Sequence, residues 1–287
     1  MDRPVFVIEA TEAKSMAKSS SLTLTQLLPS LVTSAQSLAR PPISNFHVGA
    51  VGLSPSGRIL IGVNVEFPGL PLHHSIHAEQ FLLTNLSLHD EPNLHSFAVS
   101  AAPCGHCRQF FQEIRGAPDI QIIITSESDP NFTSLSHFLP YRFGPHDLLP
   151  QHAPLFLEPR NNGLTQKLPN GVCKGDAVDE KLKIAAMEGA NKSHAPYSNS
   201  PSGMAIVDCN GKIYKGSYVE SAAFNPSLGP LQAAVVAFMV GGGGKYDEIV
   251  GAVLVEKDGA MVKQEGTVRL LLEAISPKCQ LQTFLCE

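Results

Sequence analysis

The chain has 287 residues, of which 43% are hydrophobic, with a net charge of -5 and a pI near 6.1. This length suits two domains or one large domain with a substantial core. There is no basic excess of the kind that binds a nucleic-acid backbone, and no uninterrupted apolar run of membrane-spanning length. The six cysteines suggest no disulfide scaffold, because two have the spacing of metal ligands and the other four are scattered. No targeting segment stands out near the N-terminus, so we expect a cytoplasmic protein.

Residues 1–22 are read as an N-terminal tail. Within it, Val5-Phe6-Val7-Ile8 either begins an edge strand or remains flexible, and the pattern does not decide between the two. From there, hydrophobic periodicity and turn residues predict an alternation of helices and strands typical of a layered α/β domain spanning 23–148. The expected elements are a helix at 23–39, strands at 47–54 and 58–65, a helix at 76–87, a strand at 96–101, a helix at 104–115 and a strand at 120–125.

Two short motifs in this half combine residues suited to zinc: His77-Ala78-Glu79, and the pair Cys104 and Cys107 directly after a proline. Residues three apart share a helix face, and a helix N-terminus favours the thiolate form of cysteine. His77 and Glu79 would diverge by roughly 200° inside a regular helix, so we expect them at the very start of one. Three ligands leave an open coordination position for water, which indicates a catalytic site.

Two other interpretations use the same residues. A redox pair at Cys104 and Cys107 fits poorly with the intervening Gly-His, with a proline that precedes the pair, and with the ligand motif upstream. A closed structural zinc site needs a fourth ligand, for which His73, His74 and His106 are formally available. The first two read as loop residues, and His106 should face away from the cysteines on their helix, so the three-ligand interpretation is preferred.

Residues 149–175 are rich in proline and glycine and are predicted to form an irregular linker. The chain then repeats itself at an offset of 154 residues, which predicts a second domain at 176–287 with the same order of elements. The recurring residues are Pro42, Ser44, Asn45, Gly49, Gly57, Ile59, Gly62, Val65 and Glu66, which reappear as Pro196, Ser198, Asn199, Gly203, Gly211, Ile213, Gly216, Val219 and Glu220.

The second copy keeps the scaffold and loses the chemistry. At the same offset, Leu231 stands opposite His77 and Ala233 opposite Glu79. A shift of 161 residues places Glu265 and Val268 opposite the two cysteines. No zinc can bind such a set, so we expect the second copy to be metal-free and structural.

In combination, these motifs resemble those of zinc-dependent cytidine deaminases of the two-domain, homodimeric type, and the resemblance runs from about residue 23 to the end. It implies duplicated three-layer α/β/α domains with a mixed sheet. The stretches that carry it are Ser44-Asn45-Phe46-His47-Val48-Gly49-Ala50, Asn64-Val65-Glu66, His77-Ala78-Glu79-Gln80, Pro103-Cys104-Gly105-His106-Cys107-Arg108-Gln109, Leu139-Pro140 with Phe143-Gly144-Pro145, Pro196-Tyr197-Ser198, Gly216-Ser217-Tyr218 and Ala222-Ala223-Phe224-Asn225-Pro226.

The resemblance implies hydrolytic deamination of cytidine and deoxycytidine to uridine and deoxyuridine, with release of ammonia, as in pyrimidine salvage. Zinc held by His77, Cys104 and Cys107 would activate a water that attacks C4 of the base. Glu79 would shuttle protons from this water to ring N3 and to the leaving amine.

The expected substrate contacts rest more heavily on resemblance. They comprise Asn64, Val65, Glu66, Phe46 and Ala78, with Glu66 accepting hydrogen bonds from sugar hydroxyls and Phe46 flanking the base. Alternatively, Phe46 is ordinary core and 64–66 an exposed strand end. The acid persists as Glu220 in the metal-free copy, so it also serves the fold in part.

The expected partners are a nucleoside substrate and a second copy of the chain, without nucleic acid or membrane. In the homodimer, Ala222-Ala223-Phe224 would form a lid over the partner's substrate. A deoxycytidylate or polynucleotide deaminase is the alternative enzyme, but it would need cationic groups near these motifs. A structural zinc-binding module is the alternative outside enzymes.

Overall fold

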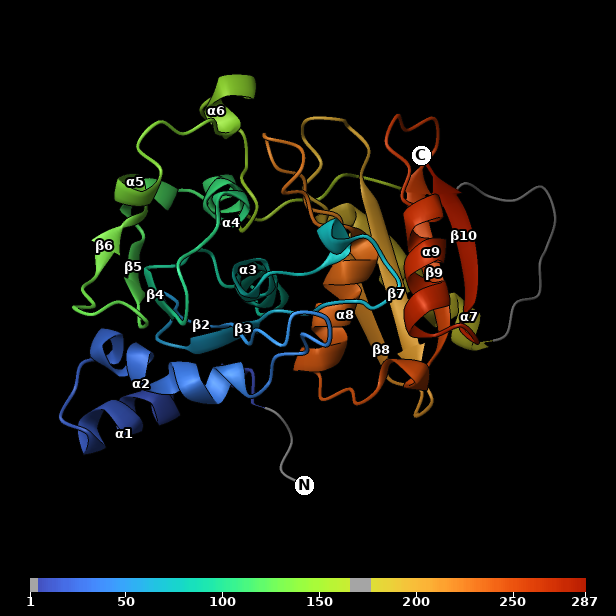
Figure 1. Ribbon diagram of the computed structural model, residues 1–287. Helices are drawn as coiled ribbons and strands as arrows, with labels where there is room; N and C mark the ends of the chain where they lie inside the picture. Colours follow the sequence, from blue (N-terminus) through green and yellow to red (C-terminus); the bar gives the residue numbers. More distant parts are fainter. Residues whose placement is uncertain (1–4, 166–176) are drawn as a thin grey trace. The chain divides into compact units, whose positions relative to one another are not determined.

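The computed structural model describes residues 5–165 and 177–287, which form two compact units (Figure 1). The first unit takes in the chain up to Pro68 together with Leu72–Glu158 and Ser221–Pro226, and the second takes in Gly69–Pro71, Pro159–Glu220 and Ser227–Glu287. Each unit is built on its own mixed sheet with helices, which confirms the predicted α/β class with two copies. Each unit also includes a short segment from the other half of the sequence.

The sheet of the first unit has the strand order β1-β3-β2-β4-β5-β6. Its strands are β1 (Val7–Ile8), β2 (Gly49–Leu53), β3 (Ile59–Val63), β4 (Ser96–Val99), β5 (Gln121–Ile124) and β6 (Thr133–Ser134). β4 and β5 run parallel, and the other pairs are antiparallel. Because β2 and β3 are buried along their whole length, they can carry helices on both faces.

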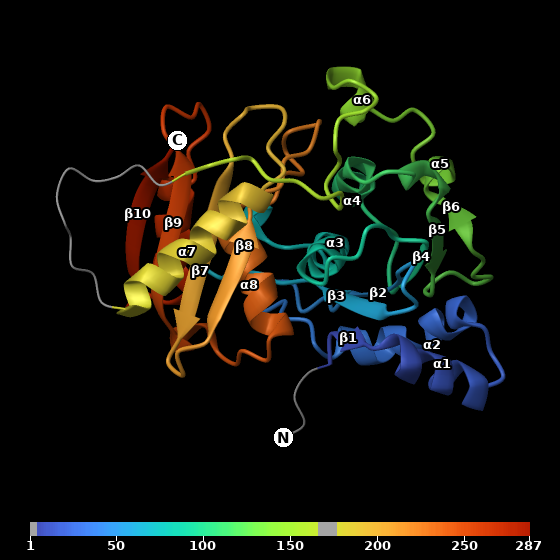
Figure 2. The same ribbon diagram turned by 180° about the vertical axis from the view of Figure 1, so that it is seen from behind.

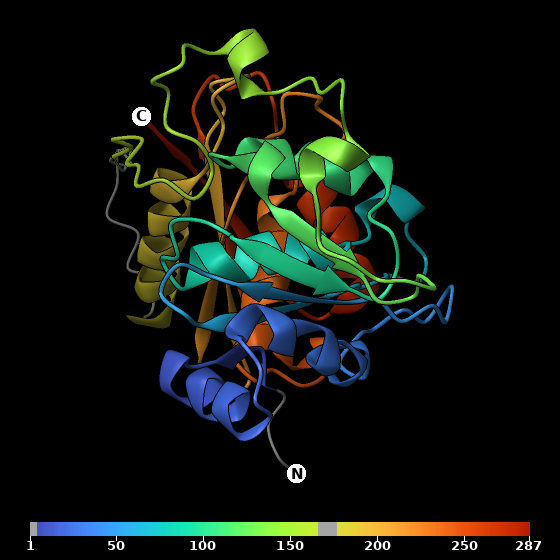
Figure 3. The same cartoon turned by 90° about the vertical axis from the view of Figure 1, so that its left-hand side faces the viewer.

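Helices cover both faces of this sheet (Figures 1 and 3). α1 (Ala10–Ser19) and α2 (Leu24–Gln36) lie on one face, and α3 (Ala78–Leu88) and α4 (Gly105–Phe110) lie on the other. Thr23 begins α2 through a reciprocal capping box with Gln26. Short helices complete the unit: η1 (Leu72–His74), η2 (Phe111–Glu113), η3 (Ala117–Asp119), α5 (Leu135–Phe138) and α6 (Pro145–Leu148).

The N-terminal region takes the edge-strand alternative. Val7 pairs with Leu60 and Ile8 with Ile59 at the margin of the sheet. The helix α1 that follows was not predicted, because its buried stripe consists only of Ala13 and Ala17 among polar residues. Two small apolar side chains give too weak a helical period to be recognised in the sequence. Residues 1–4 of the predicted tail lie outside the described residues.

The sheet of the second unit has the order β10-β9-β7-β8, with β9 and β10 parallel. Figure 2 shows α7 (Ala177–Lys192) against one face, and α8 (Pro230–Val240) and α9 (Glu265–Ile275) cover the other. The strands are β7 (Ser202–Asp208), β8 (Ile213–Ser217), β9 (Ile249–Lys257) and β10 (Gln280–Cys286), with η4 (Tyr246–Glu248) before β9. Across the described ranges, no helix is both long enough and apolar enough to cross a membrane.

The border between the compact units lies inside the predicted linker. Glu158 pairs with Arg115 of the first unit, and the Phe156 amide donates to the Glu113 carbonyl oxygen. Thr165 forms two backbone hydrogen bonds with Glu287, and this part of the predicted linker therefore belongs to the second unit. The remainder of the predicted linker, 166–175 with Cys173, lies outside the described residues.

The duplication is not aligned by one constant offset. Val65 pairs with Ile76 and Val219 pairs with Leu228, so the connection before α8 is two residues shorter than the one before α3. A glycine contact agrees with this. A Cβ on Gly62 would lie 2.1 Å from the carbonyl oxygen of the first residue of α3, and a Cβ on Gly216 would lie 2.3 Å from that of the first residue of α8. Both helices therefore approach their strands at equivalent positions.

This register corrects the residues expected to replace the catalytic pair. His77 caps α3 and Gly229 caps α8, so Gly229, not Leu231, stands opposite His77. By the same register Leu231, not Ala233, stands opposite Glu79. Neither glycine nor leucine offers a ligand or a proton, so the conclusion that the second copy lacks this chemistry is unchanged.

The start of α9 needs a similar correction of one residue. The amide of Arg108 donates to the Cys104 carbonyl oxygen in α4, and the amide of Val268 donates to the Gln264 carbonyl oxygen in α9. Gln264 and Thr267 therefore occupy the two cysteine positions, in place of Glu265 and Val268. Neither is a ligand suited to zinc in the way a thiolate is.

Candidate active site

His77 and Glu79 lie at the start of α3, as expected. His77 is the N-cap, with an extended backbone at φ -79° and ψ 153°, and Glu79 is the second helical residue. The change from extended to helical backbone removes the divergence that a regular helix would impose on residues two apart. Gly62 allows this first turn to approach β3, because a Cβ there would collide with the Ala78 carbonyl oxygen.

The two cysteines begin α4. Cys104 is the N-cap and Cys107 the third helical residue, so the helix starts at Gly105 and Pro103 lies just outside it. Arg108 fixes the start of α4, because its Nε donates to the Pro103 carbonyl oxygen at 2.7 Å and its Nη1 donates to the Phe138 carbonyl oxygen at 3.0 Å. The expected helix at 104–115 is shorter, ending at Phe110 and continuing as the 3₁₀ turn η2.

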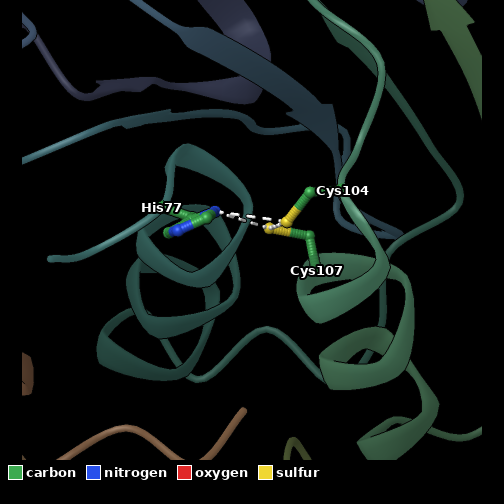
Figure 4. Close-up of side chains that lie close together, drawn as sticks. All are labelled: His77, Cys104 and Cys107. Carbon is green, nitrogen blue, oxygen red and sulfur yellow. Dashed lines mark hydrogen bonds between the residues drawn. The ribbon is translucent and has the colours of Figure 1, made fainter. Parts of the chain in front are cut away.

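The imidazole of His77 and the two sulfurs point toward one another (Figure 4). Nδ1 of His77 lies 3.5 Å from Sγ of Cys104 and 3.3 Å from Sγ of Cys107, and the two sulfurs are 3.7 Å apart. A tetrahedral zinc, with bonds of about 2.3 Å to sulfur and 2.0 Å to nitrogen, needs a sulfur–sulfur edge of about 3.8 Å and sulfur–nitrogen edges of about 3.5 Å. The triangle therefore fits zinc, whereas a disulfide would need sulfurs about 2.05 Å apart.

The site has three ligands. Among the described residues, no fourth His, Cys, Asp or Glu places a donor atom within 4.8 Å of all three ligand atoms. His73 and His74 contact each other in η1, with ring centroids 4.3 Å apart. The ring of His106 lies 5.2 Å from the ring of His77 and is not part of the ligand group. The geometry thus matches an open catalytic zinc site and not a closed structural one.

The ligand environment already favours one thiolate. The hydrogen bond with Cys107 is the largest cause that lowers the pKa of Cys104 to about 3, and the His77 imidazole adds to the effect. In return, that hydrogen bond and burial raise the pKa of Cys107 well above its usual value. The hydrogen bond with Cys104 also raises the pKa of His77. Without metal, the three side chains therefore share protons, and a zinc dication would displace these protons on binding.

Glu79 is enclosed beside the ligands. Its side chain is 5% exposed, and Sγ of Cys107 donates to its Oε2 at 3.2 Å. Burial raises its pKa, and this outweighs the hydrogen bonds and the His77 charge, which lower it. A carboxyl group whose pKa moves toward neutrality can both accept and release a proton under physiological conditions.

A cavity of about 450 Å³ lies beside the ligands and Glu79, and His77, Glu79 and Cys104 form part of its lining. That volume lies within the range of about 300–1,000 Å³ typical of small-molecule sites. Neither lysine nor arginine is among the described residues that line it, so a phosphate would find no cation there. The lining residues are Ile43, Ser44, Phe46, Val48, Asn64, Glu66, Leu72, Ser75, Ile76, His77, Ala78, Glu79, Ala101, Ala102 and Cys104.

Most of the expected substrate contacts meet at this cavity. Phe46 lines it with 59% of its side chain exposed, so it is not ordinary core. Asn64, Glu66 and Ala78 also line the cavity. Val65 does not, because it is fully buried and pairs through its backbone with Arg40 and Ile76.

Glu66 and Asn64 shape the cavity wall through hydrogen bonds. Oε2 of Glu66 accepts from the amides of Ile43 and Ser44, both at 2.9 Å, and Oε1 accepts from the Ser44 hydroxyl at 2.6 Å. Nδ2 of the Asn64 side chain donates to the Phe46 carbonyl oxygen at 2.8 Å, and its Oδ1 accepts from the Val48 backbone amide at 2.9 Å. Both side chains therefore fix the loop that presents Phe46.

Lining residues that the sequence analysis did not single out include Leu72 and Ala101-Ala102. Leu72 is 70% exposed at the cavity mouth, where a single apolar residue between Pro71 and His73 gives no clear signal. The two alanines follow β4 directly before the cysteine motif. Small side chains after a strand end are consistent with room for a ligand, but they also occur in ordinary loops.

The same carboxylate cradle exists in the second unit. Oε2 of Glu220 accepts from the amides of Tyr197 and Ser198 at 2.9 and 3.1 Å, and Oε1 accepts from the Ser198 hydroxyl. There Tyr218 replaces Asn64. Burial and the charge of Glu220 raise the pKa of Tyr218 to about 12, and its hydroxyl also meets Ser227 and Gln264. A buried tyrosine thus stands where the first unit has an amide and a cavity.

Comparisons with known proteins agree with this arrangement. Two family models, both described as "Cytidine and deoxycytidylate deaminase zinc-binding region", match residues 23–123 and 135–269. Over its full length the chain is 58% identical to cytidine deaminase 1 of Arabidopsis thaliana, covering 99% of that protein. It is 51% identical to cytidine deaminase 6 of the same plant over 90% of this chain and 91% of that one.

A bacterial relative is also similar. Cytidine deaminase of Photorhabdus laumondii is 38% identical, and the alignment covers 94% of this chain and 86% of the relative. The similarity to all three relatives therefore spans both copies and is not confined to the zinc motifs.

Proposed function

The chain belongs to the cytidine deaminase family, and from this premise we propose that the cavity beside His77, Cys104 and Cys107 deaminates cytidine and deoxycytidine. The observation that carries the proposal is a zinc-shaped triangle of three ligands that opens into a nucleoside-sized cavity. Zinc bound there supplies Lewis acidity that activates a water for attack on C4 of the cytosine ring. The products are uridine or deoxyuridine and ammonia.

Glu79 moves the protons in this proposal. Its carboxyl group is buried beside Cys107 and has a raised pKa, so it can take a proton from the attacking water. It delivers this proton to ring N3, and then takes the remaining proton of the same oxygen from the new C4 hydroxyl and passes it to the departing amine. Because it is not within the ligand group, it is free to turn toward the substrate.

The cavity wall orients the nucleoside. Phe46 offers an exposed aromatic face for the base, and Glu66 and Asn64, which follow β3 and hold the loop of Phe46, also line the cavity. Glu66 already accepts three hydrogen bonds, and a carboxylate has about four acceptor positions. We assign the remaining capacity to a sugar hydroxyl, so Glu66 holds both the loop and the ribose.

The preferred substrate is a free nucleoside. A 5′-phosphate would enter a cavity whose described lining contains no lysine or arginine, and an unpaired charge taken out of water is costly. The deoxycytidylate and polynucleotide alternatives are therefore disfavoured. Cytidine and cytidine monophosphate should differ greatly in kcat/KM, and comparable values would favour the nucleotide alternative.

We also propose a homodimer and a cytosolic location. Ile43, Phe46 and Leu72 expose 45%, 59% and 70% of their side chains at the cavity mouth, which is unusual for three apolar neighbours and suits cover by a second chain. Phe224, in the segment expected to reach the partner's substrate, is 68% exposed. All five described cysteines are free, which suits a reducing compartment.

The decisive experiment follows ammonia release from cytidine and deoxycytidine by the purified, zinc-loaded protein. Metal analysis of the same sample should give about one zinc per chain, as expected for one ligand triangle. Sedimentation of the full chain should show a dimer. Zinc-loaded protein that releases no ammonia from either nucleoside would overturn the proposed substrates.

A further inference from the structure

The segment Ser221–Pro226 comes from the second half of the sequence but belongs to the compact unit that contains the zinc ligands. Its ends are buried at Ser221, Ala222 and Pro226, whereas 223–225 are exposed. Phe224 has a left-handed backbone with φ 62°, which is strained for a bulky residue. Such a conformation persists only where the surrounding structure holds it, so this segment is firmly anchored at its ends.

One anchor is Gln80, in the first turn of α3. Its Nε2 donates to the Pro226 carbonyl oxygen at 2.9 Å, and its Oε1 accepts from the amide of His77 at 3.2 Å. The side chain is only 1% exposed, so water does not compete for either bond. A single carboxamide therefore joins the segment to the backbone of a zinc ligand.

The other anchor is Glu113, just after the cysteine helix. Oε1 of Glu113, in the turn that continues α4, accepts from the Ala222 amide at 2.7 Å, and Glu113 is fully buried. The segment thus contacts α3 and the turn that continues α4, and both of these helices carry zinc ligands at their starts.

We propose that Gln80 is a positioning residue for zinc and that the Pro226 carbonyl oxygen is its anchor, so Ser221–Pro226 orients His77 toward the metal. The physical reason is that His77 is an N-cap, whose direction depends on backbone outside the helix. Partners that orient a ligand typically change metal affinity by about 10–100-fold when removed. The inference rests on the zinc site of the proposed function but concerns metal retention, which is measured without turnover.

The first test compares two glutamines at equivalent helix positions. Gln80 in α3 and Gln232 in α8 are each the third helical residue, and both are buried. In Gln80→Met, a chelator should remove zinc about 10–100-fold faster than from the unchanged protein. The Co²⁺-substituted variant should also show shifted absorption bands. Gln232→Met should leave both readouts unchanged, and equal chelation rates in the two variants would overturn the proposal.

The second test addresses the Ala222 anchor. Glu113→Gln keeps an acceptor oxygen and should retain zinc like the unchanged protein, whereas Glu113→Leu removes the acceptor and should release zinc faster. Rescue by the conservative variant separates lost positioning from a general need for side-chain bulk. If both variants release zinc at the unchanged rate, the Ala222 contact does not position the site.

A third measurement needs no substitution and remains informative if Glu113→Leu does not fold. Coupling between two sites is reciprocal, so zinc removal should loosen the segment that orients the ligand. Hydrogen exchange of the full chain should therefore show about 10-fold faster exchange of the Ala222 amide without zinc, with β8 unchanged. Equal protection of this amide with and without zinc contradicts the proposal, while ammonia release from cytidine would still support the deaminase assignment.

Discussion

The two copies of the duplicated fold contain the same carboxylate cradle but only one contains a chemical site. Glu66 and Glu220 accept the same three kinds of hydrogen bond from equivalent loops. Asn45 and Asn199, inside those loops, share left-handed φ values of 55° and 51°. The loops are therefore maintained by folding alone. The residues at the starts of two helices supply the zinc ligands in one copy and not in the other, while the loop held by the carboxylate is kept in both.

The largest effect on activity is expected when the zinc ligand His77 is removed, which makes the first copy resemble the second at this position. His77→Ala should lose zinc and all measurable deamination, because two thiolates do not complete the triangle. The matched control is Gly229→Ala at the equivalent cap of α8, where the nearest atom is the flexible end of Gln232. Metal analysis and ammonia release of both variants test this pair. Retention of one zinc by His77→Ala would contradict the ligand assignment.

A smaller but still severe effect is expected at the proton shuttle. Glu79→Gln keeps the size of the side chain but cannot cycle a proton, so kcat should fall about 10³–10⁴-fold while zinc stays at the level of the unchanged protein. Leu231→Met at the equivalent position of α8 should leave kcat unchanged. Steady-state kinetics with metal analysis checks both. Normal turnover by Glu79→Gln would remove this residue from the mechanism.

The shared carboxylate allows the substrate role to be separated from the structural role. A glutamine at position 66 or 220 can still hold its loop, because its oxygen accepts from the amides and its nitrogen donates to the serine hydroxyl. Glu66→Gln should lower kcat/KM for cytidine about 10–100-fold through lost hydrogen bonding of the sugar to a charged acceptor. Glu220→Gln should leave kcat/KM unchanged. If the two variants have the same kinetics, Glu66 serves only the fold.

The smallest expected effect concerns acid stability. Burial tends to raise the pKa of Glu66, but hydrogen bonds from the Ser44 hydroxyl and from the Ser44 and Ile43 amides outweigh it and lower the pKa below 4.5. A lowered carboxyl pKa stabilises the fold above the unfolded value, and this contribution is lost as pH falls through the folded value. The stability difference between the unchanged protein and Glu66→Gln should therefore shrink between pH 7 and pH 4. Urea denaturation at both values measures it, and a difference that grows on acidification has the wrong sign.

Sequence patterns predicted what depends on local composition. The apolar runs of β2 and β3 and the spacing of His77, Cys104 and Cys107 each have a direct physical signature, and the helices and strands of the first copy lie close to their expected positions. The start of α3 at His77 also followed from geometry alone. His77 and Glu79 would point in different directions inside a regular helix, so they were expected at its very start. These features require no knowledge of distant contacts.

What the sequence did not predict depends on contacts between distant segments. The register of α8 differs by two residues from a constant offset, because a shorter loop precedes it, and this is visible only in contacts such as the pairing of Val219 with Leu228. The repeat indicated that Glu66 also serves the fold, but it did not identify the contacts, because they lie in the loop at Ser44, 22 residues away. No local pattern indicates a positioning role for Gln80, because its partner Pro226 is 146 residues distant. Such partners carry no periodic signal.

The late position of Ser221–Pro226 in the chain also has a consequence for biosynthesis. Every other part of the catalytic unit has been translated once Glu158 is added, but Pro226 follows 68 residues later. At about 5–20 residues per second, the ribosome needs roughly 3–14 s to reach it. Throughout that interval the nascent chain holds all three zinc ligands, while Gln80 and Glu113 still lack their acceptor and donor. The catalytic half can therefore be completed only after nearly half of the inert copy has been synthesised.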